Sequence, residues 1–113
     1  MSFLFFITIS GNVMKVIKNT SPDCASKLKV LADPTRLAVL EALMSGPKNV
    51  GDLMEQLGVE QSLLSHHLAT LRETGLVASS REGKTMIYQL HDNVSDSTSG
   101  HAIDLGCCKI SFD

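Results

Sequence analysis

The 113-residue sequence has few cysteines, no long apolar run and no excess of positive charge. Its three cysteines are an odd number and too few for the disulfide framework of a small secreted protein. The apolar run over residues 3–9 is far shorter than the roughly 20 residues of a bilayer span, and no basic segment precedes it as in a signal peptide. We therefore expect a cytoplasmic protein with free thiols and no membrane partner.

The charge balance gives no global sign of a nucleic-acid partner, since the net charge is −2. Positions 1–90 hold nine Lys and Arg residues against eight Asp and Glu residues, whereas the rest of the chain holds one Lys against four Asp. The body is near neutral and the tail is acidic. A DNA-binding function therefore has to be argued from local patterns.

The sequence also lacks the short motifs of common catalytic sites. It has no nucleophile-elbow pattern, no glycine-rich phosphate loop and no paired carboxylates. A single domain of this length has room for one modest core and rarely for an enzyme cleft as well. We predict a globular protein that is not an enzyme.

Four helical segments are predicted in the middle of the chain. Ser21 and Asp33 are good N-caps, and each precedes a proline, which suits the first helical position. Asn49 is a third predicted cap, and Gly58 stands where a left-handed residue ends a helix. Apolar residues recur at helical spacing inside these segments, which we place at residues 22–31, 34–44, 50–57 and 61–74.

A period of two replaces the helical period after Gly75. Residues 77–81 and 86–90 are predicted as the strands of a hairpin with a glycine in its turn. The stretch from Asn93 to Gly100 is rich in Ser, Thr and Asp, which favour caps and turns. We expect a helical turn from His101 to Leu105.

The third and fourth predicted helices, joined by a short turn after Gly58, have the arrangement of a helix-turn-helix. Small or hydrogen-bonding residues lie opposite the leucine stripe of the fourth helix: Gln61, Ser62, Ser65, His66 and Ala69. Such residues allow a close approach to a DNA groove and can bond base edges or phosphates. Arg81 and Lys84 of the hairpin are placed to reach adjacent phosphates. We predict double-stranded DNA as the partner, with a plain helical core as the alternative.

Two further polar residues allow more than one interpretation. His67 lies at the edge of the leucine stripe, and we favour a packing histidine over one that reads a base. Arg36 stands in the first turn of its helix, where it either touches phosphate or pairs with a nearby carboxylate.

Residues 31–37 (LADPTRL) and 65–77 (SHHLATLRETGLV) resemble the signatures of the arsenical-resistance-repressor (ArsR/SmtB) family of bacterial winged-helix regulators. Residues 81–84 and 88–90 resemble the wing of that family, so the similarity covers about residues 24–90. The resemblance implies a homodimeric repressor built on its first and last helices. Its two recognition helices are expected to enter major grooves about 34 Å apart on an inverted repeat.

The expected organisation therefore has three parts. Residues 1–20 form an N-terminal extension outside the fold, with Met14 as a plausible natural start. Residues 21–92 form a mainly α winged helix-turn-helix domain with a small β-hairpin. Residues 93–113 form a tail with a dimerisation helix and a cysteine sensor motif.

Members of the resembled family release DNA when a metal, a metalloid or a reactive sulfur species binds. Many carry a cysteine pair in the helix before the recognition helix, but residues 49–53 contain no thiol here. Others bind zinc or nickel on the last helix. His101 and Asp104 imitate one half of such a site, and the other half has no counterpart at the required spacing.

The resemblance leaves Cys24, Cys107 and Cys108 as sensor candidates. If the terminal helices pack together as in the family, the three thiols converge. Three thiolates suit trivalent arsenic or antimony, or another soft ion such as cadmium, lead or copper(I), and no obligatory cofactor is implied. One alternative is a redox or reactive-sulfur sensor in which Cys24 oxidises with either of the other two. Incidental cysteines and a winged-helix module that binds protein also stay open.

Overall fold

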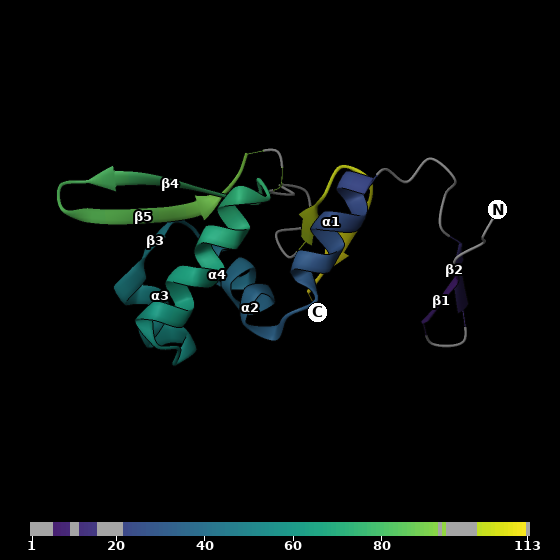
Figure 1. Ribbon diagram of the computed structural model, residues 1–113, viewed down its shortest axis with the longest axis horizontal. Helices are drawn as coiled ribbons and strands as arrows, with labels where there is room; N and C mark the ends of the chain where they lie inside the picture. The colour runs from purple at the N-terminus through teal and green to yellow at the C-terminus, as the bar shows by residue number, and fades with distance from the viewer. Residues whose placement is uncertain (1–5, 10–11, 16–21, 93, 95–101, 113) are drawn as a thin grey trace.

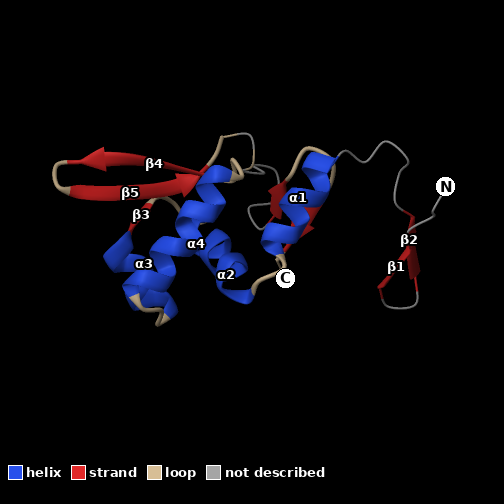
Figure 2. Cartoon of the chain, viewed as in Figure 1, coloured by secondary structure: helices blue, strands red, loops and turns tan. Residues whose placement is uncertain are grey.

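The computed structural model describes residues 6–9, 12–15, 22–92, 94 and 102–112 (Figure 1). Within these ranges, helices and short strands follow one another along the chain, coloured blue and red in Figure 2. In chain order the elements are β1 (Phe6–Ile9), β2 (Asn12–Lys15), α1 (Pro22–Leu31), α2 (Pro34–Leu43), β3 (Lys48–Asn49), α3 (Val50–Leu57), α4 (Gln61–Glu73), β4 (Val77–Glu82), β5 (Thr85–Leu90), β6 (Ala102–Asp104) and β7 (Lys109–Ser111).

The N-terminal strands form a hairpin of their own. β1 pairs with β2 in antiparallel register, with Phe6 opposite Lys15. Figure 1 shows this hairpin at the far end of the molecule from the helices α2 to α4. The boundary predicted at residue 20, and the cap predicted at Ser21, lie outside the described residues and stay predictions.

Two of the predicted helix caps are confirmed. The Asp33 carboxylate accepts the backbone N–H groups of Thr35 and Arg36 at 2.8 and 3.0 Å, which begins α2 at Pro34. Asn49 and Asp52 form a reciprocal capping box at the start of α3. Gly58 ends α3 with a φ of 66°, a left-handed conformation that favours glycine.

The predicted hairpin is confirmed and has a third strand beside it. β4 pairs with β5 from Val77–Leu90 at its base to Glu82–Thr85 at its tip, and β3 pairs with the other edge of β5. We refer to the β4–β5 hairpin as the wing, which projects from the helical body at the left of Figure 1. The sequence did not predict β3, because a two-residue strand has no alternation to detect.

One hydrophobic core joins the helices to the sheet. The leucine stripe of α4 faces this core, and each fully buried leucine contributes about 1.5–3 kcal/mol of transfer free energy. The largest fully buried side chains are Leu40, Leu53, Leu64, Leu68, Leu71, Leu76 and Ile103. The opposite face of α4 is consequently turned outward.

The expectation of a helical turn from His101 to Leu105 is wrong over the described part of that segment. Residues 102–104 form strand β6, which pairs with β7 through Ile103 opposite Ile110. Two β-branched residues facing each other favour a strand, and Gly106, with a φ of 90°, allows the chain to reverse. We refer to β6 and β7 as the C-terminal hairpin.

This correction removes two sequence-based expectations for the described residues. His101 lies outside them, and Asp104 is in a strand, so the pair does not share a helix face as the half-site for zinc or nickel requires. A last helix for dimerisation is also missing from the described residues after Leu90. None of the described helices is both long and apolar enough to cross a membrane.

Candidate nucleic-acid interface and thiol cluster

The predicted DNA-facing residues of α4 share one exposed face. Leu64, Leu68 and Leu71 are buried in the core, and the exposed residues on the outer side are Gln61, Ser62, Ser65 and His66. We refer to these four residues as the recognition face. Leu63 stands at its edge and is 48% exposed, an exposed apolar side chain that was not among the predicted site residues. The sequence feature that could have indicated Leu63 is its position outside the buried leucine stripe of α4.

The start of α4 carries an acidic group beside the recognition face. Glu60 occupies the N-cap position, and its side chain accepts a hydrogen bond from the Ser62 hydroxyl. The Ser62 hydroxyl is therefore directed towards a carboxylate within its own chain. The hydroxyl must leave this carboxylate before it can donate to another group, whereas its oxygen can still accept a hydrogen bond.

A shallow groove of about 390 Å³ joins the recognition face to the wing. Gln61 of α4 and Lys84 of the wing tip both line it, together with the first residues of α3. Arg81 and Lys84 are exposed, and Gly83 turns the tip with a φ of 64°. Two of the predicted contact residues thus lie on one concave surface.

His67 and Arg36 point inward. His67 is 7% exposed, and its Nδ1 atom lies 3.3 Å from Arg36 Nη1. Arg36 Nε donates to the carbonyl of Val30 at 2.6 Å, and His67 Nε2 lies 4.0 Å from a carboxylate oxygen of Asp33. His67 is therefore a packing histidine, and Arg36 bonds a carbonyl where a phosphate or a carboxylate was expected.

The Asp33 carboxyl is stabilised in its charged form at this corner. The hydrogen bond from the Arg36 amide lowers the pKa of Asp33 below its ordinary value, and the charge of a protonated His67 acts in the same direction. Partial burial opposes both effects. The carboxylate thus caps α2 and faces the buried histidine at the same time.

The three cysteines meet at one point of the surface. Cys24 and Cys107 form a disulfide with a Cα–Cα distance of 6.2 Å, a separation usual for this bond, so the expectation of free thiols is wrong for this pair. Cys108 keeps a free thiol, and all three sulfur atoms lie within 4.8 Å of one another. Cys24 is buried, Cys107 exposed and Cys108 half-buried. We refer to these residues as the thiol cluster.

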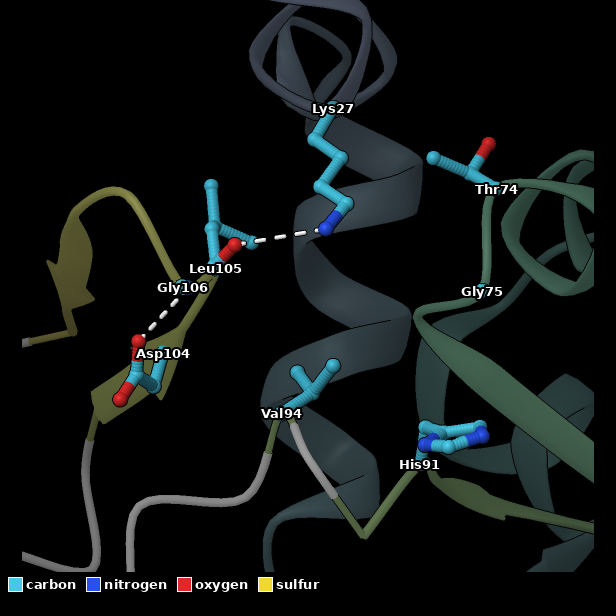
Figure 3. Close-up of a pocket in the computed structure, with 8 residues that line it drawn as sticks. All are labelled: Lys27, Thr74, Gly75, His91, Val94, Asp104, Leu105 and Gly106. Carbon is cyan, nitrogen blue, oxygen red and sulfur yellow. Dashed lines mark hydrogen bonds between the residues drawn. The ribbon is translucent and has the colours of Figure 1, made fainter. Parts of the chain in front are cut away.

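The thiol cluster adjoins a cavity that the sequence did not predict. Its volume is about 470 Å³, and it lies between α1, the turn after α4 and the C-terminal hairpin (Figure 3). Lys27 extends across one side and donates to the carbonyl of Leu105 at 3.3 Å, while His91 lies on the other side. The Gly106 amide donates to the Asp104 carboxylate, which shapes the turn that leads to Cys107. The hairpin is thus tied to α1 by a covalent and a polar contact.

Comparison with known proteins identifies the fold. Residues 33–79 match the family model described as bacterial regulatory protein, arsR family. The biofilm growth-associated repressor of Xylella fastidiosa is 40% identical over 83 residues, covering 74% of this chain and 73% of that protein. The chain belongs to the ArsR family. Its matched segment includes the recognition face and the start of the wing.

Other relatives of this ArsR-family chain are regulators, and their names differ in how much of their function they state. NmtR of Mycobacterium tuberculosis, an HTH-type transcriptional regulator, is 48% identical over 68 residues, or 60% of this chain. The probable mercury resistance operon repressor of Streptomyces lividans is 33% identical over 98 residues, covering 79% of this chain and 78% of that protein. The matches span only 57% of NmtR and 59% of Rv0081 of the same organism.

Solved structures agree with the winged helix-turn-helix of the ArsR family. HlyU of Vibrio cholerae matches with a TM-score of 0.63 at 37% identity, covering 67% of this chain and 83% of that one. The homodimeric winged helix-turn-helix DNA-binding domain Mb0332 of Mycobacterium bovis matches with a TM-score of 0.58 at 27% identity, covering 66% of this chain and 75% of that one. The predicted fold class is confirmed. The family is one of transcriptional regulators rather than enzymes.

Proposed function

We propose that this protein is a homodimeric repressor that inserts α4 into the major groove of an inverted-repeat operator. The observation that carries the proposal is the exposed, hydrogen-bonding recognition face on a helix whose other face is locked into the core. A fixed inner face holds the outer face in one orientation. That rigidity is what reading base edges requires.

Each residue of the interface has a proposed role. Gln61, Ser65 and His66 donate or accept at base edges, and Ser62 reaches base or phosphate after leaving Glu60. Leu63 packs on a thymine methyl group. Arg81 and Lys84 neutralise phosphates beside the groove, which positions the helix without reading sequence.

The operator interaction is tested by fluorescence anisotropy on the inverted repeat nearest to the gene. The double variant Ser65→Ala with His66→Ala is expected to weaken specific binding by about tenfold or more, while binding to unrelated DNA stays the same. Glu55→Gln on the exposed side of α3 is the matched control. Salt-insensitive binding, or no preference for any inverted repeat, would support a module that binds protein instead.

We propose that α1 contributes to the dimer interface. Leu28 of α1 is 37% exposed, an apolar side chain on the helix that the family resemblance assigns to dimerisation. The homodimeric state of Mb0332 supports the same arrangement. In native mass spectrometry, Leu28→Asp is expected to shift the protein towards monomer, and Leu63→Asp is the control. A dimer unaffected by Leu28→Asp would place the interface elsewhere.

The proposed inducer is a soft ion bound by the reduced thiol cluster. Sulfurs that share a tetrahedral ion with bonds of about 2.3 Å lie roughly 4 Å apart, and the three sulfurs here lie within 4.8 Å of one another. The three donors are thus close enough to converge on one ion after a thiol reductant has supplied two electrons and two protons to the disulfide and the two bonded sulfurs have moved apart, because the thiolate is the ligand. Trivalent arsenic and antimony are the leading candidates, followed by cadmium, mercury, lead and copper(I).

A redox or reactive-sulfur sensor is the second candidate, and the disulfide between Cys24 and Cys107 favours it. Disulfides in reducing compartments are usually catalytic or redox-sensing. With hydrogen peroxide as oxidant, two thiols lose two electrons and two protons to form the disulfide, and the hydrogen peroxide is reduced to two water molecules. The bond formed joins α1 to the C-terminal hairpin.

One experiment separates the two candidates. Native mass spectrometry of the reduced protein with arsenite, cadmium and zinc reports bound-ion stoichiometry, and operator release is measured in parallel with arsenite and with polysulfide. Cys108→Ser is expected to abolish ion-driven release and leave oxidation of Cys24 with Cys107 intact. Release by polysulfide alone supports the redox sensor, and unchanged arsenite release in Cys108→Ser contradicts the ion site.

A further inference from the structure

We infer that Arg36 and His67 are positioning residues that couple the helix bearing Cys24 to the recognition helix. The inference rests on the proposed function, and it concerns how a change at the thiol cluster reaches the DNA-facing surface. Three contacts in series connect the two places: Cys107 of the C-terminal hairpin to Cys24 of α1, Val30 of α1 to Arg36, and Arg36 to His67 of α4.

The first contact fixes α1 to the end of the chain. The Cys24 disulfide and the bond from Lys27 to the Leu105 carbonyl both join α1 to the C-terminal hairpin. Cys24 stands in the first turn of α1 and Val30 in its last. Because a short helix moves as a rigid body, a shift imposed at Cys24 also moves the carbonyl of Val30.

The second contact transfers that position to Arg36. Its Nε atom donates to Val30 at 2.6 Å, a charge-assisted bond of the stronger kind. Asp33 accepts the backbone amide of Arg36 and so fixes where the side chain of Arg36 begins. The planar guanidinium can hold two acceptors at once in a fixed geometry, which a lysine ammonium cannot match.

The third contact reaches the recognition helix. Arg36 Nη1 donates to His67 Nδ1 at 3.3 Å, so the neutral ring carries its proton on Nε2, towards the Asp33 carboxylate 4.0 Å away. His67 is 7% exposed and immediately follows His66 of the recognition face. A displacement of Arg36 therefore changes the rotation or tilt of α4 beneath the residues that meet DNA.

The test is a coupling measurement on the full-length protein. Operator affinity is determined for the disulfide and the reduced forms, and their ratio is compared between variants. We expect the wild type to bind about tenfold more tightly in one form than in the other, in the usual range of allosteric coupling. Arg36→Gln and His67→Gln are each expected to bring the ratio close to one, and the double variant to lower it no further.

Two controls separate coupling from damage to the fold. Arg72→Gln changes another arginine, one in the last turn of α4 that bonds the Ser79 hydroxyl of the wing, and it is expected to keep the wild-type ratio. Arg36→Lys keeps the charge but bonds one acceptor at a time, and it is expected to lose most of the ratio while retaining the thermal unfolding profile of the wild type. A ratio unaltered in both Arg36 variants overturns the inference.

A spectroscopic readout does not depend on DNA. Long-range ¹H–¹⁵N spectra of the imidazole rings are expected to show His67 protonated on Nε2, with a ring shift that changes on reduction in the wild type and not in Arg36→Gln. An unshifted His67 on reduction, or a wild-type affinity ratio of one, overturns the inference. Absence of operator binding by any form instead removes the proposed function on which it rests.

Discussion

The helix-turn-helix with its wing and the unit of α1 with the C-terminal hairpin are built in different ways. The first, from Asp33 to Leu90, is held by helix caps, a buried leucine stripe and strand pairing, and most of it matches the family model. The second is joined by one disulfide and a polar contact beside a cavity, and its Leu31, Ile103 and Leu105 side chains pack into the same core. The proposed DNA-reading scaffold thus carries an attached element, α1 with the C-terminal hairpin, and one of the bonds that hold this element is a disulfide that reduction can open.

The largest expected effect concerns the scaffold. Leu68→Ala removes a fully buried side chain from α4 and is expected to lower the free energy of unfolding by about 2–5 kcal/mol, measured by urea denaturation. Leu63→Ala, on the exposed side of the same helix, is expected to change it by about 0.5 kcal/mol or less. Equal losses in the two variants would contradict the assignment of inner and outer faces.

The next effect concerns the attached element. Cys107→Ser removes the bond between residues 83 positions apart and is expected to cost about 2–4 kcal/mol of the unfolding free energy of the oxidised protein, because the unfolded chain is no longer constrained. Cys108→Ser is the matched control, because it keeps the disulfide. A second control compares the reduced wild type with reduced Cys107→Ser, since neither contains the disulfide. If Cys107→Ser unfolds at the same urea concentration as the oxidised wild type, the disulfide does not stabilise the attachment of the C-terminal hairpin, and the comparison of the two regions is wrong.

A smaller effect on stability is expected from Asp33, which stands between α1 and α2. Its pKa is lower in the folded protein than its ordinary value of 3.8, so the charged carboxylate stabilises the fold at neutral pH. That contribution is complete above the unfolded pKa and is lost as the pH falls through the folded pKa. Asp33→Asn keeps a good N-cap but does not titrate. The wild type is therefore expected to lose more stability than Asp33→Asn below about pH 4, as followed by thermal unfolding against pH.

The smallest effect concerns the wing. Lys84→Ala is expected to reduce the slope of log affinity against log salt concentration by about 0.9, the value for one phosphate contact. Lys29→Ala, an exposed lysine of α1 away from the wing, serves as control and is expected to leave the slope unchanged. A slope altered equally by both variants would mean that the wing makes no specific phosphate contact.

The scaffold could be predicted from the sequence because its signals are local. Asp33 and Asn49 bond amides two or three residues away, and the leucines of α4 repeat with the helical period. The wing follows from a change of period and a glycine at its turn. Such features depend on neighbours along the chain, so a single sequence contains them in full.

The attached element could not be predicted in the same way. Strand β6 spans three residues, and its pairing with β7 depends on the burial of Ile103 by elements far away in the sequence. The resemblance to the family implied convergence of the three cysteines, but not which pair bonds. The inward turn of Arg36 also depends on Val30 and His67, which lie on other helices.

The most direct test of the proposed repressor function is to map the DNA-bound surface by amide chemical shifts. Isotope-labelled protein is titrated with operator duplex under oxidising and under reducing conditions. The largest changes are predicted at Ser62, Ser65 and His66 of the recognition face and at Lys84 of the wing, in the binding-competent form only. Changes confined to other surfaces, such as the exposed side of α2 around Glu41, would contradict the proposal.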